Sequence, residues 1–437
     1  MAPRFDITRV RLRNYKSIES CDVELGPLTL LVGPNGSGKS NFLDALQFVA
    51  DALNTNLENA FRERGGFGSV SRFGDREFEI EITVGSGDAS WDYGLGLSPL
   101  RDGGYRVASE SWHFPDGEGV RLESDLHSRL WLPNADGDAS DLLLEALSGF
   151  RSVSPIPEQM RDISRPDLGD RLLRDASNAP NVIARLTADD PATKRLIEEY
   201  LTLVVDGMVG VESRQISSWR ALLFKQETED GQAREFDALS MSDGTLHALG
   251  VLIALFEGTE TVGIEEPESG LHPAAAAVLM DALRDGAHRR QVLVTTHSPD
   301  LLDVPGLDAS EVLAVRSVRG RTVIGRLNAA GSCALKESLY TPGALIRTKL
   351  SPAGERRMSL PTVVPVVEGH SETTAVRVLL NRIGWELGWP HRVAQPFRVP
   401  RTALADPAKL GDAVAVASRN VPGRPTTRSS DAGRRSN

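Results

Sequence analysis

The sequence is poor in several features that mark particular classes of protein. It has only two cysteines, Cys21 and Cys333, which lie too far apart to suggest a metal site or a disulfide framework. The longest apolar run, residues 248–256, is too short to cross a bilayer. Residues 1–4 lead into mixed polar sequence, so no signal peptide is visible. We therefore expect a cytoplasmic protein with no membrane partner.

The chain also lacks an excess of basic residues and any regular repeat. Its 49 Lys and Arg residues face 60 Asp and Glu residues, for a net charge of −11. Contact with DNA would therefore require a local basic patch. Sustained heptads are absent, which argues against a long coiled-coil arm. A length of 437 residues with 40% apolar content suggests about two to three domains with buried cores.

The most informative stretch lies between a short apolar run, residues 28–32, and a helical pattern, residues 41–53. It reads Gly33, Pro34, Asn35, Gly36, Ser37, Gly38, Lys39 and Ser40. This is the G-x-x-x-x-G-K-[ST] pattern in the strand–loop–helix setting that a phosphate loop needs. The glycines let successive N–H groups turn inward around phosphate oxygens, and the start of the helix adds the positive end of its dipole.

Two residues of this loop have distinct expected roles. Lys39 would reach the β- and γ-phosphates, and the Ser40 hydroxyl would hold Mg²⁺. The alternative is a glycine-rich turn that only caps a helix. Because both flanks have the expected pattern, the stretch predicts a nucleotide site.

Two later strands are predicted to end in polar side chains. Residues 261–264 are apolar and lead into Glu265 and Glu266, and residues 291–294 precede His297. In a parallel sheet these side chains would meet at the carboxyl edge. One carboxylate can then hold Mg²⁺ through water while its neighbour orients or deprotonates the attacking water. His297 can bond the γ-phosphate or that water. The alternatives are that Glu265 and Glu266 form a solvated acidic turn and that His297 has only a structural role.

A small-polar turn precedes the apolar helical stretch 246–256. It contains Ser242, Asp243, Gly244 and Thr245. Free N–H groups at such a helix start can bind an anion. Taken alone, the turn is equally well explained as an ordinary N-cap, with Ser242 or Asp243 as the capping residue.

The remaining stretches give a coarse outline of secondary structure. Five predicted strands cover residues 7–12, 21–25, 78–84, 91–97 and 105–114, the last three of them antiparallel. Residues 140–207 have a helical pattern that several prolines interrupt.

Taken together and in this order, these motifs resemble the ATP-binding-cassette class of ATPase heads. The resemblance is strongest to the RecF, SMC and overcoming-lysogenisation-defect (OLD) group of AAA-family ATPases, and it covers roughly residues 4–340 apart from 140–207. It implies that residues 33–40 are Walker A, 264–267 Walker B, 242–245 the signature and 269–272 the D-loop. The sequence departs from the family pattern at two points. Glu265 occupies a position where many relatives have Asp. No glutamine is evident for the Q-loop, since Gln47 lies inside the first predicted helix.

This resemblance implies a fold and a mechanism. The fold would be an α/β P-loop head, with a mixed sheet, flanking helices and an antiparallel β subdomain. Glu266 and His297 would be catalytic, and Ser40 and Glu265 would hold Mg²⁺. Ser242, Asp243 and Gly244 would act in trans on ATP that a second copy binds, so that hydrolysis requires a homodimer of heads.

The resemblance also implies a setting, namely DNA repair, DNA maintenance or anti-phage defence, with DNA or a nuclease or toxin protein as partner. Two rival interpretations remain. The nucleotide-binding subunit of a transporter would share the motifs, although the inserted strands argue against it. A non-hydrolysing ATP sensor that acts as a scaffold for a nuclease or toxin is the stronger rival, because Glu265 is unusual.

The composition and pattern of the sequence change in its C-terminal part. We expect a head over residues 1–346 with a helical insertion around 140–207, a linker over 347–360, a segment resembling the start of a TOPRIM domain over 361–418, and a disordered Arg-rich tail over 419–437. In a TOPRIM-like segment Glu368 would be the metal-associated glutamate, with Glu372 near it. After Glu386 the acidic residues are Asp406, Asp412 and Asp431. No paired aspartates follow, so we expect a gene truncation or frameshift and no nuclease activity.

Overall fold

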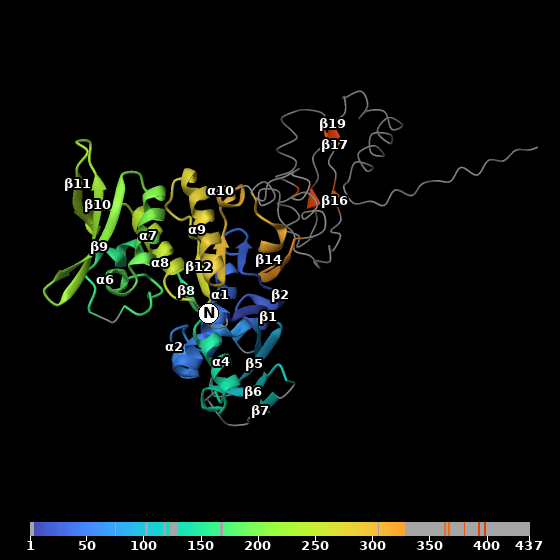
Figure 1. Cartoon of the computed structure of the whole chain (residues 1–437). Coiled ribbons are helices and arrows are strands. Elements are labelled where there is room, and N and C mark those ends of the chain that lie inside the picture. Colours follow the sequence, from blue (N-terminus) through green and yellow to red (C-terminus); the bar gives the residue numbers. More distant parts are fainter. Residues whose placement is uncertain are drawn as a thin grey trace, which may run out of the picture. The chain divides into compact units, whose positions relative to one another are not determined.

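The computed structural model describes residues 4–327, apart from residues 75, 101–103, 117–118, 123–129, 167–168 and 305. Beyond residue 327 it describes 362–363, 366–367, 380, 392–393 and 397–398. The chain divides into two compact units, Met1–Glu355 and Arg356–Asn437 (Figure 1). This division falls within the linker that the sequence predicts.

The first unit is built on a twelve-stranded sheet. In spatial order its strands are β7 (Gly119–Leu122), β6 (Tyr105–His113), β5 (Ala89–Pro99), β4 (Phe78–Ser86), β1 (Asp6–Tyr15), β2 (Ile18–Glu24), β15 (Arg321–Arg326), β14 (Val312–Val318), β3 (Leu28–Val32), β13 (Val292–Thr296), β12 (Val262–Glu265) and β8 (Arg151–Val153).

The sheet has an antiparallel half and a parallel half. The six strands from β7 to β2 pair antiparallel with one another, which confirms the predicted antiparallel strands β4, β5 and β6. Strand β15 joins the two halves, pairing parallel with β2 and antiparallel with β14. The five strands β14, β3, β13, β12 and β8 pair parallel. The carboxyl ends of β3, β13 and β12 therefore lie side by side at one edge of the sheet.

The helices around the sheet vary widely in length. They are α1 (Lys39–Asn54), α2 (Leu57–Arg62), α3 (Phe67–Val70), α4 (Asp138–Ser148), α5 (Pro157–Arg161), α6 (Ala179–Asp189), α7 (Pro191–Val204), α8 (Asp243–Phe256), α9 (Ala276–Arg289) and α10 (Pro299–Leu302). Short 3₁₀ turns are η1 (Arg72–Gly74), η2 (Leu132–Asn134), η3 (Ala238–Ser240), η4 (Pro273–Ala275) and η5 (Ala309–Glu311).

Strand β3 is buried along its whole length because both faces of the parallel half are covered. Its side chains alternate between two cores. Leu30 and Val32 pack in a core that includes residues of α6 to α9. Leu31 packs in a second core, which includes residues of α1 and of the antiparallel strands. The apolar run that predicted this strand is thus explained by a central position in the sheet.

Residues 140–207 contain more than the predicted helices. Helices α4 to α7 lie there, but so does β8, a three-residue strand that the sequence did not predict and that pairs with β12. A separate antiparallel sheet follows, made of β9 (Met208–Ile216), β10 (Trp219–Glu227) and β11 (Ala233–Asp237). Its buried Val211 and Phe224 pack in the same core as residues of α6 and α7, beside which the sheet lies in Figure 1.

The described part of the second unit consists mainly of short strands. β16 (Thr362–Val363) pairs parallel with β18 (Arg392–Val393), and β17 (Val366–Val367) pairs parallel with β19 (Phe397–Arg398). The predictions for Glu368, Glu372 and the Arg-rich tail fall outside the described residues. No helix in the described part of the chain is long and apolar enough to span a bilayer.

Candidate nucleotide-binding site

The loop between β3 and α1 needs glycine at two positions. Gly38 has φ 101°, and a Cβ there would overlap the side chain of Thr322. A Cβ on Gly33 would overlap the carbonyl oxygen of Val315. Gly38 is also the N-cap of α1 and has no side chain to bond the N–H groups of the first turn. Those N–H groups are therefore directed at the loop, where an anion can accept them.

Lys39 is buried within this loop, with 5% of its surface exposed. Its Nζ donates to the carbonyl oxygens of Gly33 at 2.9 Å and Pro34 at 3.2 Å. Burial lowers the pKa of Lys39, while the nearby carboxylates of Glu266, Glu268 and Glu265 act in the opposite direction. The ammonium group thus folds back onto its own loop, at the place where phosphate oxygens would provide stronger acceptors.

The hydroxyl of Ser37 supports the same conclusion. Its Oγ is buried and has no hydrogen-bond partner. A buried hydroxyl without a partner costs free energy, so such an atom calls for an explanation. A phosphate bound in the loop would supply the missing acceptor, so the loop fits a nucleotide.

A hydrogen-bonded group of side chains holds the loop from behind. Thr322, on β15, donates its hydroxyl to the carbonyl oxygen of Ser37 at 2.8 Å. The Ser17 hydroxyl lies 2.7 Å from Thr322 Oγ1 and accepts a bond of 2.7 Å from the amide of Asn41. Sequence reasoning missed this support. Ser17 and Asn41 were visible beside the predicted motifs, but nothing in the sequence places Thr322 near them.

Glu265 ends β12 and has a cationic partner that the sequence did not reveal. Its Oε1 accepts a bond of 2.8 Å from the guanidinium of Arg174. Ser152, on β8, lies 3.5 Å from the same oxygen. The Glu265 side chain is 13% exposed and that of Arg174 is 54% exposed. The predicted metal carboxylate is therefore nearly buried and charge-paired.

Glu266 follows β12 in an unusual backbone conformation. Its φ is 45°, which for a residue other than glycine costs about 1–3 kcal/mol. Its N–H donates to the carbonyl oxygen of Thr295 at 2.9 Å. Its Oε1 lies 3.2 Å from Nδ1 of His297 and 4.0 Å from Nζ of Lys39. Lys39, Glu266 and His297 follow three adjacent parallel strands, and the structure brings them together as the sequence predicts. His297 here faces the carboxylate of Glu266.

Another histidine, absent from the sequence prediction, holds the backbone of Glu266. His247, on α8, is buried, with Nε2 3.1 Å from the carbonyl oxygen of Glu266 and Nδ1 3.3 Å from that of Pro155. Burial lowers the pKa of His247, which the two backbone contacts partly oppose. A single histidine in an otherwise apolar helix was the available signal.

The turn before α8 is both a cap and part of the site. Ser242 is the N-cap, and its Oγ accepts the N–H of Thr245 at 3.1 Å, as the ordinary capping interpretation predicts. Ser242 and Asp243 are exposed, whereas Gly244 is buried against the carbonyl oxygen of Gly270. Asp243 is paired with Arg161.

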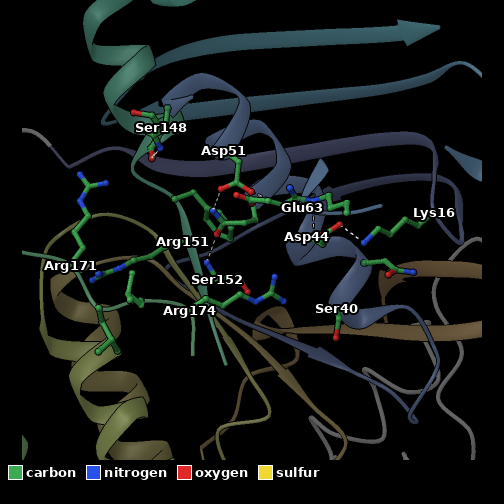
Figure 2. Close-up of a pocket in the computed structure, with 17 residues that line it drawn as sticks. Lys16, Ser40, Asp44, Asp51, Glu63, Ser148, Arg151, Ser152, Arg171 and Arg174 are labelled. Carbon is green, nitrogen blue, oxygen red and sulfur yellow. Dashed lines mark hydrogen bonds and ion pairs between the residues drawn. The ribbon is translucent and has the colours of Figure 1, made fainter. Parts of the chain in front are cut away.

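Two cavities meet at Ser40. One, of about 560 Å³, is lined by the predicted metal ligands Ser40 and Glu265 together with Glu266, Asp243 and His247. The other, of about 610 Å³, lies along α1 and is shown in Figure 2. Its lining includes Ser40, Gln47, Arg151, Arg171 and Arg174. Within the described part of the chain the side chain of Gln47, on α1, accepts a hydrogen bond from the N–H of Ser152 and donates one to Asp51. These bonds give Gln47 a structural role.

The oxygen donors fit Mg²⁺. Within the described ranges no group of three or more His, Cys, Asp or Glu side chains has the arrangement of a metal site. Mg²⁺ at a nucleotide needs fewer, because it keeps waters and takes phosphate oxygens beside one or two protein oxygens. Ser40 and Glu265, which line one cavity, provide such oxygens.

Comparison with known proteins finds relatives in sequence and a solved structure that aligns with this chain. The chain is 25% identical to the OLD nuclease of Thermus scotoductus, over 86% of this chain and 74% of that protein. It is 27% identical to the DNA replication and repair protein RecF of Brucella abortus, over 55% of this chain and 69% of that one. A solved Smc head domain derived from Pyrococcus furiosus, bound to the C-terminal domain of ScpA, aligns over 77% of this chain and 99% of its own, with a TM-score of 0.48 and 14% identity.

A family model matches more than half of the chain. It covers residues 28–303 and is described as "AAA domain, putative AbiEii toxin, Type IV TA system". This range includes the loop after β3, the carboxylates Glu265 and Glu266, and His297. The predicted fold class, a mixed α/β head with an antiparallel subdomain, is also confirmed. The chain belongs to this family of AAA-type P-loop ATPase domains, within the group related to OLD nuclease and RecF.

Proposed function

We propose that this chain binds ATP with Mg²⁺ in the loop after β3 and hydrolyses it. The observation that supports this most strongly is the meeting of Lys39, Glu266 and His297 at the ends of three adjacent strands. These residues lie far apart in the sequence. A cation, a carboxylate and an imidazole at one edge of a parallel sheet can bind the phosphates and position the attacking water in phosphoryl transfer.

Each residue has a role that follows from its position. Lys39 exchanges the carbonyl oxygens of Gly33 and Pro34 for the β- and γ-phosphates. Glu266 orients the attacking water and accepts its proton, and its strained backbone is fixed by Thr295 and His247. His297 holds the Glu266 carboxylate in place through Nδ1. Mg²⁺, held by Ser40 and Glu265, would supply neutralisation of the phosphate charge.

We also propose that hydrolysis occurs between two copies of the chain. Ser242 and Asp243 are exposed at the start of α8, where a second copy can present them to bound ATP. Gly244 has a supporting role, since its lack of a side chain permits the contact with Gly270 in the same chain. The cellular setting we propose is DNA maintenance or defence against phage, because the relatives are named as an OLD nuclease and as a DNA replication and repair protein.

A second candidate function is supported by one specific contact. Arg174 is bonded directly to Glu265, the carboxylate that would hold the metal. A protein in which this pair persists would bind ATP without turning it over, and would serve as a sensor or scaffold for a nuclease or toxin partner. The two functions therefore differ in turnover and not in binding.

The deciding experiment measures ATP binding by calorimetry and phosphate release on the same preparation of the whole chain, with Mg²⁺ and with EDTA. Binding together with Mg²⁺-dependent phosphate release that rises more than linearly with protein concentration would support the dimeric ATPase. Binding without release would favour the sensor. A chain that binds no ATP would refute both.

A further inference from the structure

Arg174 lies where the two cavities approach each other. It lines the cavity along α1 together with Ser40, and Glu265, its partner, lines the second cavity together with Ser40. A third hollow contains both Arg174 and Glu265. In Figure 2 the side chain of Arg174 extends from the edge of the cavity toward α1, the helix that begins with Lys39 and Ser40. The Arg174–Glu265 pair therefore stands beside the proposed phosphate and metal positions.

The two partners of this pair differ in their freedom to move. Glu265 ends a buried strand, and its nearly buried carboxylate needs a positive partner because an isolated buried charge is costly. The backbone of Arg174 is fixed, since its carbonyl oxygen accepts the N–H of Ser154 at 2.7 Å. Its guanidinium is half exposed at the end of a long side chain. Arg174 can therefore change partners without any movement of the main chain.

Mg²⁺ would compete with Arg174 for Glu265. A divalent cation and a guanidinium that share one carboxylate oxygen repel each other, so arrival of the metal weakens the pair. The terminal phosphate of a nucleotide offers the displaced guanidinium a better acceptor, because phosphate oxygens accept two parallel N–H bonds from arginine. The same ligand thus removes one partner of Arg174 and supplies another.

We propose that Arg174 is a phosphate-binding residue that exchanges partners: it neutralises Glu265 in the absence of metal and binds the terminal phosphate of the nucleotide once Mg²⁺ has taken Glu265. This inference rests on the proposed nucleotide site. Arg174 would thereby make the affinity for the nucleotide depend on the binding of Mg²⁺. The exchange explains why a cation occupies the carboxylate that Mg²⁺ needs.

The test measures ATP affinity by calorimetry in EDTA, where Arg174 is held by Glu265 in the wild-type chain. Glu265→Gln releases Arg174, so we expect ATP to bind about tenfold more tightly than to wild type, as one new charge-assisted bond would give. The loss of a negative charge could produce part of that gain. The double variant Glu265→Gln/Arg174→Ala separates the two causes, because only the Arg174-dependent part disappears.

A matched control is available three residues earlier. Arg171 lines the same cavity and is 57% exposed, but its carboxylate partner is Glu260, 3.5 Å away. Glu265→Gln/Arg171→Ala should therefore keep the gain in EDTA. With Mg²⁺, Arg174→Ala should weaken ATP binding by about tenfold and Arg174→Lys by less, while Arg171→Ala leaves it unchanged. Thermal unfolding of every variant checks that the fold is retained.

The outcomes are distinct. No gain in Glu265→Gln, or a gain that survives the removal of Arg174, would overturn the exchange of partners while the ATP site itself stands. A wild-type chain that fails to bind ATP with Mg²⁺ would overturn the proposed function and this inference together.

Discussion

Thr322 donates its hydroxyl to the carbonyl oxygen of Ser37 at 2.8 Å and thereby joins strand β15 to the loop after β3. The two residues are 285 positions apart. Thr322 is buried, and Gly38 packs directly against it. The shape of the proposed phosphate site thus depends on a strand that follows every recognised motif of the head.

Replacement of Thr322 by Val should weaken ATP binding with little change in shape. Val has the same branching but donates no hydrogen bond, so the loop would lose its connection to β15. We expect a loss of about three- to tenfold in affinity, the usual value of one neutral hydrogen bond. Calorimetry measures it, and Thr202→Val, on α7, is the control because Thr202 bonds only its own helix at Glu198. Unchanged affinity in Thr322→Val would mean that the loop keeps its form without this bond.

Lys39→Ala should abolish measurable ATP binding. Its ammonium group lies within the loop after β3, where it would neutralise the phosphates. Lys194→Ala is the matched control, because Lys194 is also largely buried but pairs with Glu198 on α7. Wild-type affinity in Lys39→Ala, measured by calorimetry with Mg²⁺, would remove the basis of the proposed site.

Glu266→Gln should keep ATP bound and slow its turnover. Loss of a group that accepts the proton of the attacking water typically reduces the rate by roughly 10²-fold or more. Because ATP then persists, the variant should accumulate as a dimer of heads in light scattering with ATP and Mg²⁺. Phosphate release and scattering are measured on the same samples, with Asp281→Asn, an exposed carboxylate on α9, as control.

Ser242→Arg added to Glu266→Gln should prevent that dimer. Ser242 is exposed at the start of α8, and a large cation there would obstruct the surface that a second copy contacts. A Glu266→Gln protein that remains monomeric with ATP would contradict the proposal that hydrolysis occurs between two copies of the chain.

The stability of the first unit should depend on pH through Asp44. Burial would raise the pKa of Asp44, but Arg64, Lys16 and the Tyr15 hydroxyl outweigh it, so the pKa is lowered. The resulting stabilisation is fully present above the unfolded pKa of about 3.9 and is lost as the pH falls through the lowered folded value. Asp44→Asn should therefore cost about 3–5 kcal/mol at pH 7 and about 1 kcal/mol less near pH 3, because below the unfolded pKa the stabilisation falls by about 1.4 kcal/mol per pH unit.

Urea denaturation at the two pH values measures this difference. Asp22→Asn is the control, because Asp22 is 49% exposed although it also pairs with arginines. An exposed pair of this kind contributes about 1 kcal/mol or less. If both variants lose the same free energy of unfolding at pH 7, the burial of Asp44 is not the cause of its contribution to stability.

The purified chain should not cleave DNA. Metal-dependent cleavage needs carboxylates that hold one or two Mg²⁺ ions, and the sequence after Glu386 has no paired aspartates to complete Glu368 and Glu372. The relative from Thermus scotoductus is named a nuclease, so the expectation is specific to this sequence. A nicking assay with Mg²⁺ or Mn²⁺ checks it. Cleavage that is lost in Glu368→Ala would contradict the prediction.

Much of the parallel half of the sheet could be predicted from the sequence because its signals are local. The run before Gly33 is apolar except for Thr29, as expected of a strand covered on both faces, and it coincides with β3. The placement of Glu266 and His297 followed from the same rule, since both come directly after buried strands. Residue order alone was enough to bring them to one edge.

Other features could not be predicted from the sequence because they depend on contacts between distant residues. Strand β8 has three residues and exists through its pairing with β12, more than a hundred positions later. Strand β11 is mostly exposed and carries no apolar alternation. Arg174 lies on a connecting segment without a motif, and its significance comes from Glu265, which is 91 positions away. No pattern within a window of the sequence reports such contacts.

The position of β3 has a consequence for how the protein is made. Its two neighbours in the sheet are β13 and β14, both of which follow residue 290. During synthesis the motif of residues 33–40 leaves the ribosome well before either neighbour of its strand, since β13 begins only at residue 292. Pairing over such separations is slow, and an apolar strand left open meanwhile invites aggregation. The nascent chain should therefore acquire its affinity for nucleotide late and in one step, and should depend on chaperones until then.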